Sequence, residues 1–166
     1  MTKTFSDLFL HPGHLIRRAH QIHMSLFDDE FAVYDISPVQ YVILKVLEEY
    51  EEMDLTTAAG IAAVDKPSCT RFVGRLAVRG LVSTSSDASD QRRKRLRLTA
   101  KGRKLIPRLD QSARVLEERM MERLPAARRE QFLDIMAEFA ALNNDLSRAP
   151  HQPPAIGATA PALDDA

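Results

Sequence analysis

Apolar residues recur at helical spacing near the start of the chain, and they form two neighbouring stripes rather than one. The spacing of three and four residues predicts a long helix over residues 12–33. The first stripe contains Leu15, Ala19, Ile22 and Leu26, and the second contains Ile16, His23, Phe27 and Phe31. Because two adjacent stripes bury more surface than one neighbouring helix covers, the pattern indicates contact with a partner subunit.

The next part of the chain predicts three shorter helices. Ser37 is a typical N-cap, and the apolar residues after it face one side of a helix that we expect over residues 38–50. Residues 54–64 are expected to form a short helix of small residues. The third helix follows Asp65, whose carboxylate suits an N-cap, and ends at Gly80.

Two strands and two further helices complete the pattern. Residues 95–98 alternate strictly between arginine and leucine, which is typical of a strand with one buried face. We expect the run 94–99 to pair with residues 81–86 in a hairpin. Two helices then follow, separated by Pro125. Their apolar positions are Leu105, Leu109, Leu116, Met120 and Leu124 in one, and Phe132, Ile135, Met136, Phe139, Leu142 and Leu146 in the other. Residues 148–166, which are rich in Pro and Ala, are predicted to be disordered.

The helix after Asp65 divides its two faces by chemistry. Its apolar side contains Cys69, Phe72, Val73 and Leu76. Its other side contains only hydrogen-bond donors and no acid, namely Lys66, Ser68, Thr70, Arg71 and Arg75. The face is therefore suited to a partner that offers acceptors, as phosphates and many base edges do.

Charge is segregated along the chain although the net charge is zero. Residues 66–104 hold 12 Lys and Arg against 2 Asp and Glu, a balance of +10, whereas residues 1–65 hold 4 against 11. A charged run is often only a solvated face. Here the run coincides with the donor-only helix and with a basic hairpin, and this coincidence favours a polyanionic partner.

Three helices followed by a basic hairpin form the plan of a winged helix-turn-helix. In that plan the third helix enters the major groove of double-stranded DNA and the hairpin, or wing, reaches the neighbouring minor groove. The expected wing contacts are Arg92, Arg93, Lys94 and Arg95. We therefore predict a mainly α fold with a small β-hairpin wing and a DNA-binding function.

Two segments resemble the multiple-antibiotic-resistance regulator (MarR) family. "VDKPSCTRFVGRLAVRGLV" is similar to its recognition segment, and "DASDQRRKRLRLTAKGR" to its wing, including the final Leu-Thr-x-x-Gly motif. The resemblance implies a homodimer, with residues 10–36 and 104–147 as dimerisation helices and residues 37–103 as the DNA-binding lobe. Ala58 departs from the family pattern, which usually has Leu there.

Within that family, "PGHLIRRAHQIHMSLF" resembles the first helix of regulators of aromatic-acid and aromatic-acyl-CoA catabolism. The resemblance implies a small aromatic acid or aromatic acyl-CoA effector. Candidate ligand-binding residues are Arg17, Arg18, His20 and His23, since guanidinium matches carboxylate and imidazole can bond a second oxygen. The alternative is that these arginines pair with acids across the dimer or contact DNA phosphates.

Other chemistries are less well supported by the sequence. His11, His14, His20 and His23 could suggest a metal, but no cysteine joins them, and we expect no metal and no cofactor. Cys69 is expected to be buried and inert rather than a redox switch. The chain has no nucleophile elbow or phosphate loop, so we expect no enzyme. A single cysteine and the lack of a signal peptide or apolar span of about 18 residues favour a cytoplasmic protein without membrane contact. A DNA-binding or architectural protein without an effector remains the alternative function.

Overall fold

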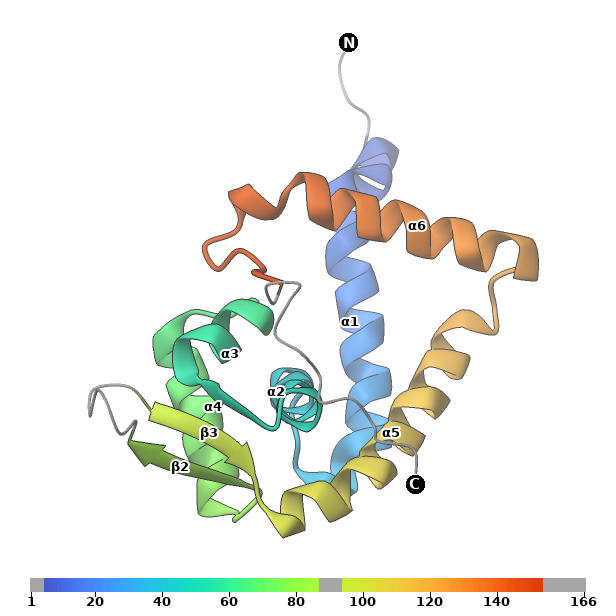
Figure 1. Ribbon diagram of the computed structural model, residues 1–166. Coiled ribbons are helices and arrows are strands. Elements are labelled where there is room, and N and C mark those ends of the chain that lie inside the picture. The colour runs from blue at the N-terminus through green and yellow to red at the C-terminus, as the bar shows by residue number, and fades with distance from the viewer. Residues whose placement is uncertain (1–4, 87–93, 154–166) are drawn as a thin grey trace, which may run out of the picture.

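The computed structural model describes residues 5–86 and 94–153, and it is mainly helical with a small antiparallel sheet. Figure 1 shows a lobe made of α2, α3, α4 and the strands beside the long helix α1, with α5 leading away from the lobe and α6 passing in front of the other end of α1 in this view. The helices are α1 (Pro12–Phe31), α2 (Pro38–Glu49), α3 (Leu55–Ile61), α4 (Lys66–Val78), α5 (Ala100–Met121) and α6 (Ala126–Leu142). The strands are β1 (Glu52–Asp54), β2 (Val82–Ser86) and β3 (Lys94–Leu98). Short 3-10 turns cover Phe5–Leu10 (η1), Ala32–Tyr34 (η2) and Asn144–Leu146 (η3).

The structure confirms the N-caps predicted for α2 and α4 and the predicted end of α4. Ser37 forms a capping box with Gln40, since the Gln40 amide donates to Ser37 Oγ at 3.3 Å and the Ser37 amide donates to Gln40 Oε1 at 2.9 Å. Asp65 caps α4 by accepting from the Ser68 amide at 2.8 Å. Gly80 follows α4 with φ of 69°, a left-handed conformation that glycine adopts without strain.

The sheet contains one strand more than the predicted hairpin. β3 pairs with β2 as expected, and β1 pairs antiparallel with the other edge of β3, so that Met53 lies opposite Leu96. The buried side chains Leu96 and Leu98 turn the same face of β3 toward the core. β1 thereby fixes the wing to the start of α3, which begins at the next residue.

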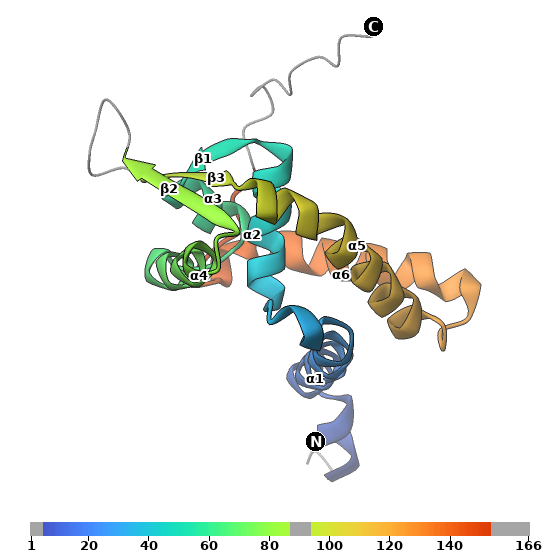
Figure 2. The same cartoon turned by 90° about the horizontal axis from the view of Figure 1, so that it is seen from below.

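The core lies where α2 passes between the rest of the lobe and α1. Seen from below in Figure 2, α2 occupies the centre, with α4 and the sheet on one side and α1 on the other. Its Ile43, Leu44 and Leu47 are at most 1% exposed. Phe31 at the end of α1 and Leu109 on α5 close the core from the other side. The lobe is thus held against the two long helices by apolar packing.

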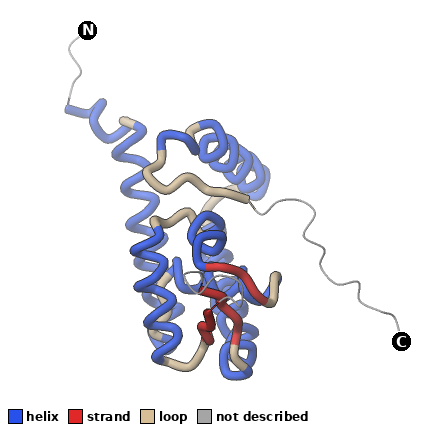
Figure 3. Tube along the Cα trace, turned by 60° about the vertical axis from the view of Figure 1, so that its left-hand side comes forward, coloured by secondary structure: helices blue, strands red, loops and turns tan. Residues whose placement is uncertain are grey.

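The first and last helices leave much apolar surface uncovered in a single chain. Figure 3 shows α1 running along one side of the molecule. No residue of α6 is buried, and Phe139 is 47% exposed. The N-terminal half of α1 adds Leu15, Ile16 and Ile22, each about half exposed. Of the helices in the described ranges, none has the length and hydrophobicity needed to cross a bilayer.

The segment after α6 differs in part from the predicted disorder of residues 148–166. Residues 148–153 have described positions, and the Gln152 amide donates to the Gly60 carbonyl at the end of α3 over 2.9 Å. Asn144 holds the same segment, since its side chain exchanges two hydrogen bonds with the main chain of His151, at 2.7 and 2.9 Å. Residues 154–166 lie outside the described residues.

Candidate nucleic-acid interface

The inner face of α4 anchors the helix firmly in the lobe. Cys69 and Leu76 are fully buried and Val73 is 4% exposed. The Cys69 thiol points at the Leu55 carbonyl of α3, with 3.9 Å between sulfur and oxygen. Since α3 and α4 are fixed to each other in this way, the opposite face of α4 is presented on a rigid support.

The outer face of α4 carries the cations and hydroxyls predicted from the sequence and no acidic side chain. Lys66, Thr70, Arg71 and Arg75 are exposed, and Ser68 is half-buried beside the cap. Arg71 donates to Ser68 Oγ at 3.4 Å, and its guanidinium lies 5.6 Å from the centre of the Phe72 ring. Thr70 Oγ1 donates to the Lys66 carbonyl at 2.8 Å. Arg71 is therefore held near the N-terminal end of the helix, the end that meets base edges in this class of fold.

Two hollows, one on each side of α4, bring further polar residues next to its outer face, and the sequence pattern did not predict these residues. One of about 570 Å³ lies between α4 and the start of α2 and is lined by Gln40 together with Arg71, Arg75 and Arg79. The other, of about 670 Å³, brings Thr56 and Thr57 at the start of α3 beside Lys66, Thr70 and Lys94. The helix caps at Ser37 and Asp54 are the sequence signals that mark these two helix starts.

The wing presents basic residues of two kinds. Lys94 is exposed and reaches the hollow beside α3, whereas Arg95 is partly buried with its Nε 3.8 Å from Glu52 Oε1. Arg97 also pairs with Glu52. The carboxylate of Glu52 on β1 therefore compensates part of the positive charge at the base of the wing. Lys94 instead lines the hollow beside α4. The predicted contacts Arg92 and Arg93 lie outside the described residues.

The Leu-Thr-x-x-Gly motif joins the wing to α5. Thr99 caps α5 by accepting from the Gly102 amide at 3.0 Å, and its hydroxyl donates to the Gly80 carbonyl at 2.6 Å. Gly102 lies against the backbone just before β2, because a Cβ there would fall 2.2 Å from the Leu81 carbonyl oxygen. The motif thus ties together the end of α4, the first wing strand and the start of α5.

The candidate ligand residues lie on the exposed part of α1. Arg17 and Arg18 both donate to Gln21 Oε1 at 3.0 Å, and Arg17 also lies 3.5 Å from His14 Nδ1. His20 is exposed, whereas His23 is partly buried beside Phe27. Burial, and then the neighbouring His20, lower the pKa of His23, so this imidazole favours its neutral form. Within the chain, no acid pairs with Arg17 or Arg18 among the described residues.

Metal and redox chemistry have little support from the geometry. Among the described residues, no three His, Cys, Asp or Glu side chains come close enough to hold a metal ion. Burial, assisted by Asp65, raises the pKa of the Cys69 thiol to about 11. The thiol therefore stays protonated at neutral pH and is a poor nucleophile.

Known proteins share this architecture. Residues 36–94 match the MarR family. The transcriptional repressor NicR of Pseudomonas putida is 30% identical over 127 residues, which cover 76% of this chain and 80% of that protein.

Two solved structures extend the similarity to the whole fold. The PcaV transcriptional regulator of Streptomyces coelicolor, solved with its natural ligand, is 30% identical with a TM-score of 0.77, covering 85% of this chain and 98% of that one. BpsR of Bordetella bronchiseptica, whose DNA binding is regulated by 6-hydroxynicotinic acid, is 25% identical with a TM-score of 0.76, covering 84% and 98%. The recognition helix, the wing and the long flanking helices therefore identify this chain as a member of the MarR family of winged helix-turn-helix transcriptional regulators.

Proposed function

We propose that the protein is a transcriptional repressor that binds double-stranded DNA as a homodimer and is released by a small aromatic acid or aromatic acyl-CoA. The observation that carries the proposal is the cationic, acid-free outer face of α4, held on a buried inner face and flanked by basic residues of the wing. NicR is a repressor, and BpsR is regulated in its DNA binding by an aromatic acid. A regulator of this kind acts on the chromosome, so we place it in the cytoplasm and assign it no catalytic role.

On DNA, α4 is proposed to lie in the major groove. Arg71, with its guanidinium fork at the N-terminal half of the helix, is suited to a guanine edge, and Lys66 and Arg75 to the flanking phosphates. Ser68 and Thr70 supply smaller donors. The wing residues Arg92, Arg93, Lys94 and Arg95 are proposed to enter or border the minor groove, where the negative potential favours arginine.

The homodimer is supported by the apolar surfaces of α1 and α6. Phe132, Ile135, Met136, Phe139 and Leu142 share one side of α6, and each is between 38% and 73% exposed. A stripe of this length is uncommon on a stable single chain in water. We propose that residues 10–36 and 104–147 of two chains interlock, which places the recognition helices about 34 Å apart, one turn of DNA.

A substitution on α6 tests the dimer. Phe139→Glu puts a charge into the apolar stripe and should shift the mass measured by light scattering toward the monomer at micromolar concentration. Ala137→Glu, on the opposite side of the same helix, is the matched control and should stay dimeric. A wild-type protein that is monomeric under these conditions contradicts the proposal.

The effector is proposed to bind beside α1, with its acid group near Arg17, Arg18, His20 and His23. Arg17→Ala should keep its DNA affinity and lose release by the effector. If the same ligand concentration releases both proteins, the assignment is wrong. Loss of DNA binding in Arg17→Ala without ligand would favour the alternative, that this arginine pairs within the dimer or contacts phosphate. If no aromatic acid or CoA thioester changes the DNA affinity, the protein is the alternative, a DNA-binding protein without an effector.

A further inference from the structure

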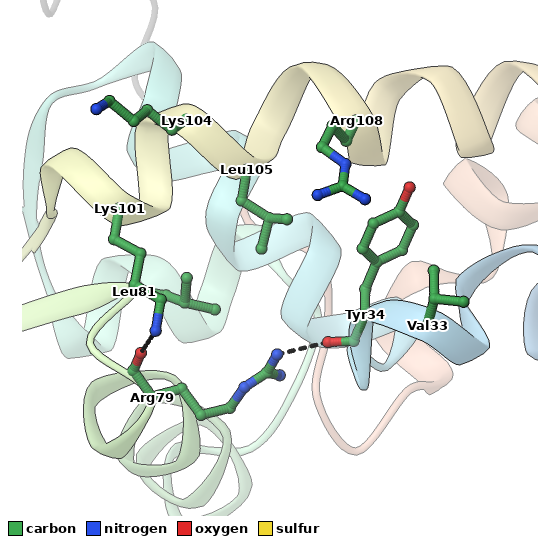
Figure 4. A pocket seen from close by; sticks show the side chains of 8 residues that line it. All are labelled: Val33, Tyr34, Arg79, Leu81, Lys101, Lys104, Leu105 and Arg108. Atoms are coloured by element: carbon green, nitrogen blue, oxygen red, sulfur yellow. Dashed lines mark hydrogen bonds between the residues drawn. The ribbon is translucent and has the colours of Figure 1, made fainter.

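A hollow at the base of the lobe gathers four cationic side chains from two helices. It has a volume of about 320 Å³ and lies between η2, the end of α4 and the first turns of α5. Figure 4 shows Lys101, Lys104 and Arg108 on α5 above it and Arg79 below. Neither the recognition face of α4 nor the α1 residues Arg17 and His23 line it.

The positive charge of this hollow is only weakly compensated. Arg79 donates to the main-chain carbonyls of Tyr34 and Asp35, and Lys101 donates to the Arg79 carbonyl at 2.8 Å. Carbonyl oxygens carry no net charge, so these three bonds do not neutralise the two cations. The Asp35 carboxylate lies 3.8 Å from Arg79, but its side chain is 96% exposed to water. In the described part of the chain, no carboxylate pairs with Lys104 or lines the hollow. Like charges gathered in this way attract an anion.

The walls of the hollow add an apolar component. Leu105 and the buried Leu81 point into it, and the Tyr34 ring forms one side, with the Arg108 guanidinium 5.4 Å from the ring centre. A bare inorganic ion would use only the cations. A flat or compact organic anion would also contact the leucines and the ring, which gives it an advantage over phosphate.

We propose that this hollow is a second ligand site, which binds a small organic carboxylate. The carboxylate lies among Lys101, Lys104 and Arg108, and the apolar body of the ligand lies against Leu105 and the Tyr34 ring. The site goes beyond the proposed effector site on α1. On the lobe side its walls come from Arg79 and Leu81, in the short link between α4 and β2, and on the other side they come from η2 and α5. Its occupant therefore contacts both parts of the chain at their junction.

Calorimetric titration of the full-length protein with benzoate tests the proposal without DNA. The titrations use an Arg17→Ala background, so that binding at the proposed α1 site does not obscure the second site. On this background, Lys104→Glu should weaken benzoate binding by at least about tenfold, which equals about 1.4 kcal/mol. Arg103→Glu is the matched control, because Arg103 is an exposed neighbour on α5 that does not line the hollow, and it should bind benzoate as the background does.

Two further probes distinguish the source of binding. Benzamide, which has the same ring without the charge, should bind at least about tenfold more weakly than benzoate, and inorganic phosphate should also bind more weakly. Equal losses in Lys104→Glu and Arg103→Glu would show a general charge effect and overturn the site. Unchanged benzoate binding in Lys104→Glu would overturn the proposed carboxylate site as well. If that variant keeps its benzoate affinity and loses affinity for DNA, the hollow binds a DNA phosphate instead. Since the benzoate titration contains no DNA, its failure is separate from a failure of the repressor function.

Discussion

Tyr41 on α2 donates a hydrogen bond to Asp110 on α5, with 2.9 Å between the phenol oxygen and Oδ1. The other carboxylate oxygen accepts from Lys45 Nζ at 3.0 Å. Both donors lie on α2, whereas Asp110 lies on the long helix α5. The pair is therefore a polar connection between these two helices, beside the apolar packing of Phe31 and Leu109.

Removing the phenol hydroxyl should weaken this connection. Tyr41→Phe leaves the ring in place and should lower the free energy of unfolding by about 1 kcal/mol, because one hydrogen bond to a charged, partly exposed acceptor is lost. Chemical denaturation at one fixed protein concentration measures the change, since dimer stability depends on concentration. Tyr50→Phe, at the end of the same helix, is the control and should change the stability by less than about half of that.

The same contact predicts a pH dependence. Burial, and then the bond to Asp110, raise the pKa of Tyr41 to about 12. The unfolded chain loses this proton near pH 10, so the folded chain binds more protons between pH 10 and 12. The contribution of Tyr41 to stability is thus complete below about pH 10 and is lost as the pH rises toward 12. Tyrosinate absorbance should show a late-titrating component in the wild type that is lost in Tyr41→Phe. A late component that persists in Tyr41→Phe with unchanged amplitude, or its absence from the wild type, would contradict the assignment.

Gly102 should not tolerate a larger side chain. In Gly102→Ala the new Cβ would lie 2.2 Å from the Leu81 carbonyl oxygen and 3.1 Å from Leu98 Cδ2, and neither the backbone of the buried Leu81 nor the buried side chain of Leu98 can yield easily. We expect a loss of about 2 kcal/mol or more in unfolding free energy, despite the better helix propensity of alanine. Gly74→Ala is the matched control, because nothing lies within 4 Å of its Cβ position, and it should raise stability by up to about 1 kcal/mol.

The two kinds of DNA contact should separate by substitution. Arg71→Ala should cost about 1–3 kcal/mol on the preferred site and reduce discrimination against other sequences. Arg92→Ala should instead weaken binding to most sequences and flatten the dependence on salt. Anisotropy titrations on the preferred site and on random duplex at several salt concentrations measure both effects. Equal losses on the two duplexes for Arg71→Ala would contradict its base-reading role.

Cys69 should be chemically silent while the protein is folded. Its burial and raised pKa predict that Ellman's reagent does not react with the native dimer and reacts fully in denaturant. Peroxide should accordingly leave the DNA affinity unchanged. Rapid reaction of the native thiol, or release from DNA by peroxide, would show that this cysteine is accessible and would revive a redox role.

Local sequence chemistry predicted much of the fold, and the failures share a physical cause. The cap at Asp65 and the stop at Gly80 depend on neighbours within a few residues, so the bounds of α4 could be inferred. β1 could not, because Glu52, Met53 and Asp54 lack a strand pattern and become a strand only by pairing with β3. For the same reason, the Glu52 partner of Arg95 was not foreseen, and Arg95 was predicted only as a DNA contact of the wing.

The helix α5 gives a second example of a tertiary effect that the sequence conceals. Pro107 is the eighth residue of this helix and lies at the start of its third turn, and the helix continues through it. The spacing of the apolar residues predicted a helix that spans this proline. The helix tolerates Pro107 because the proline is exposed and lies outside the core. The contact of residues 148–153 with α3 was also missed, since a segment rich in Pro and Ala shows no periodicity, and its hydrogen bonds are made mainly to main-chain groups.

The most direct test of the central claim is the DNA affinity of the dimer with and without an aromatic acid. A duplex carrying the site that the protein protects in footprinting of its own genomic DNA would be titrated by anisotropy, alone and with saturating effector chosen by thermal shift. The account predicts a pseudo-palindromic footprint with half-sites about one DNA turn apart, and affinity that falls by at least about tenfold with effector. Affinity that stays unchanged with every aromatic acid and CoA thioester, or protection without a two-fold pattern, would contradict it.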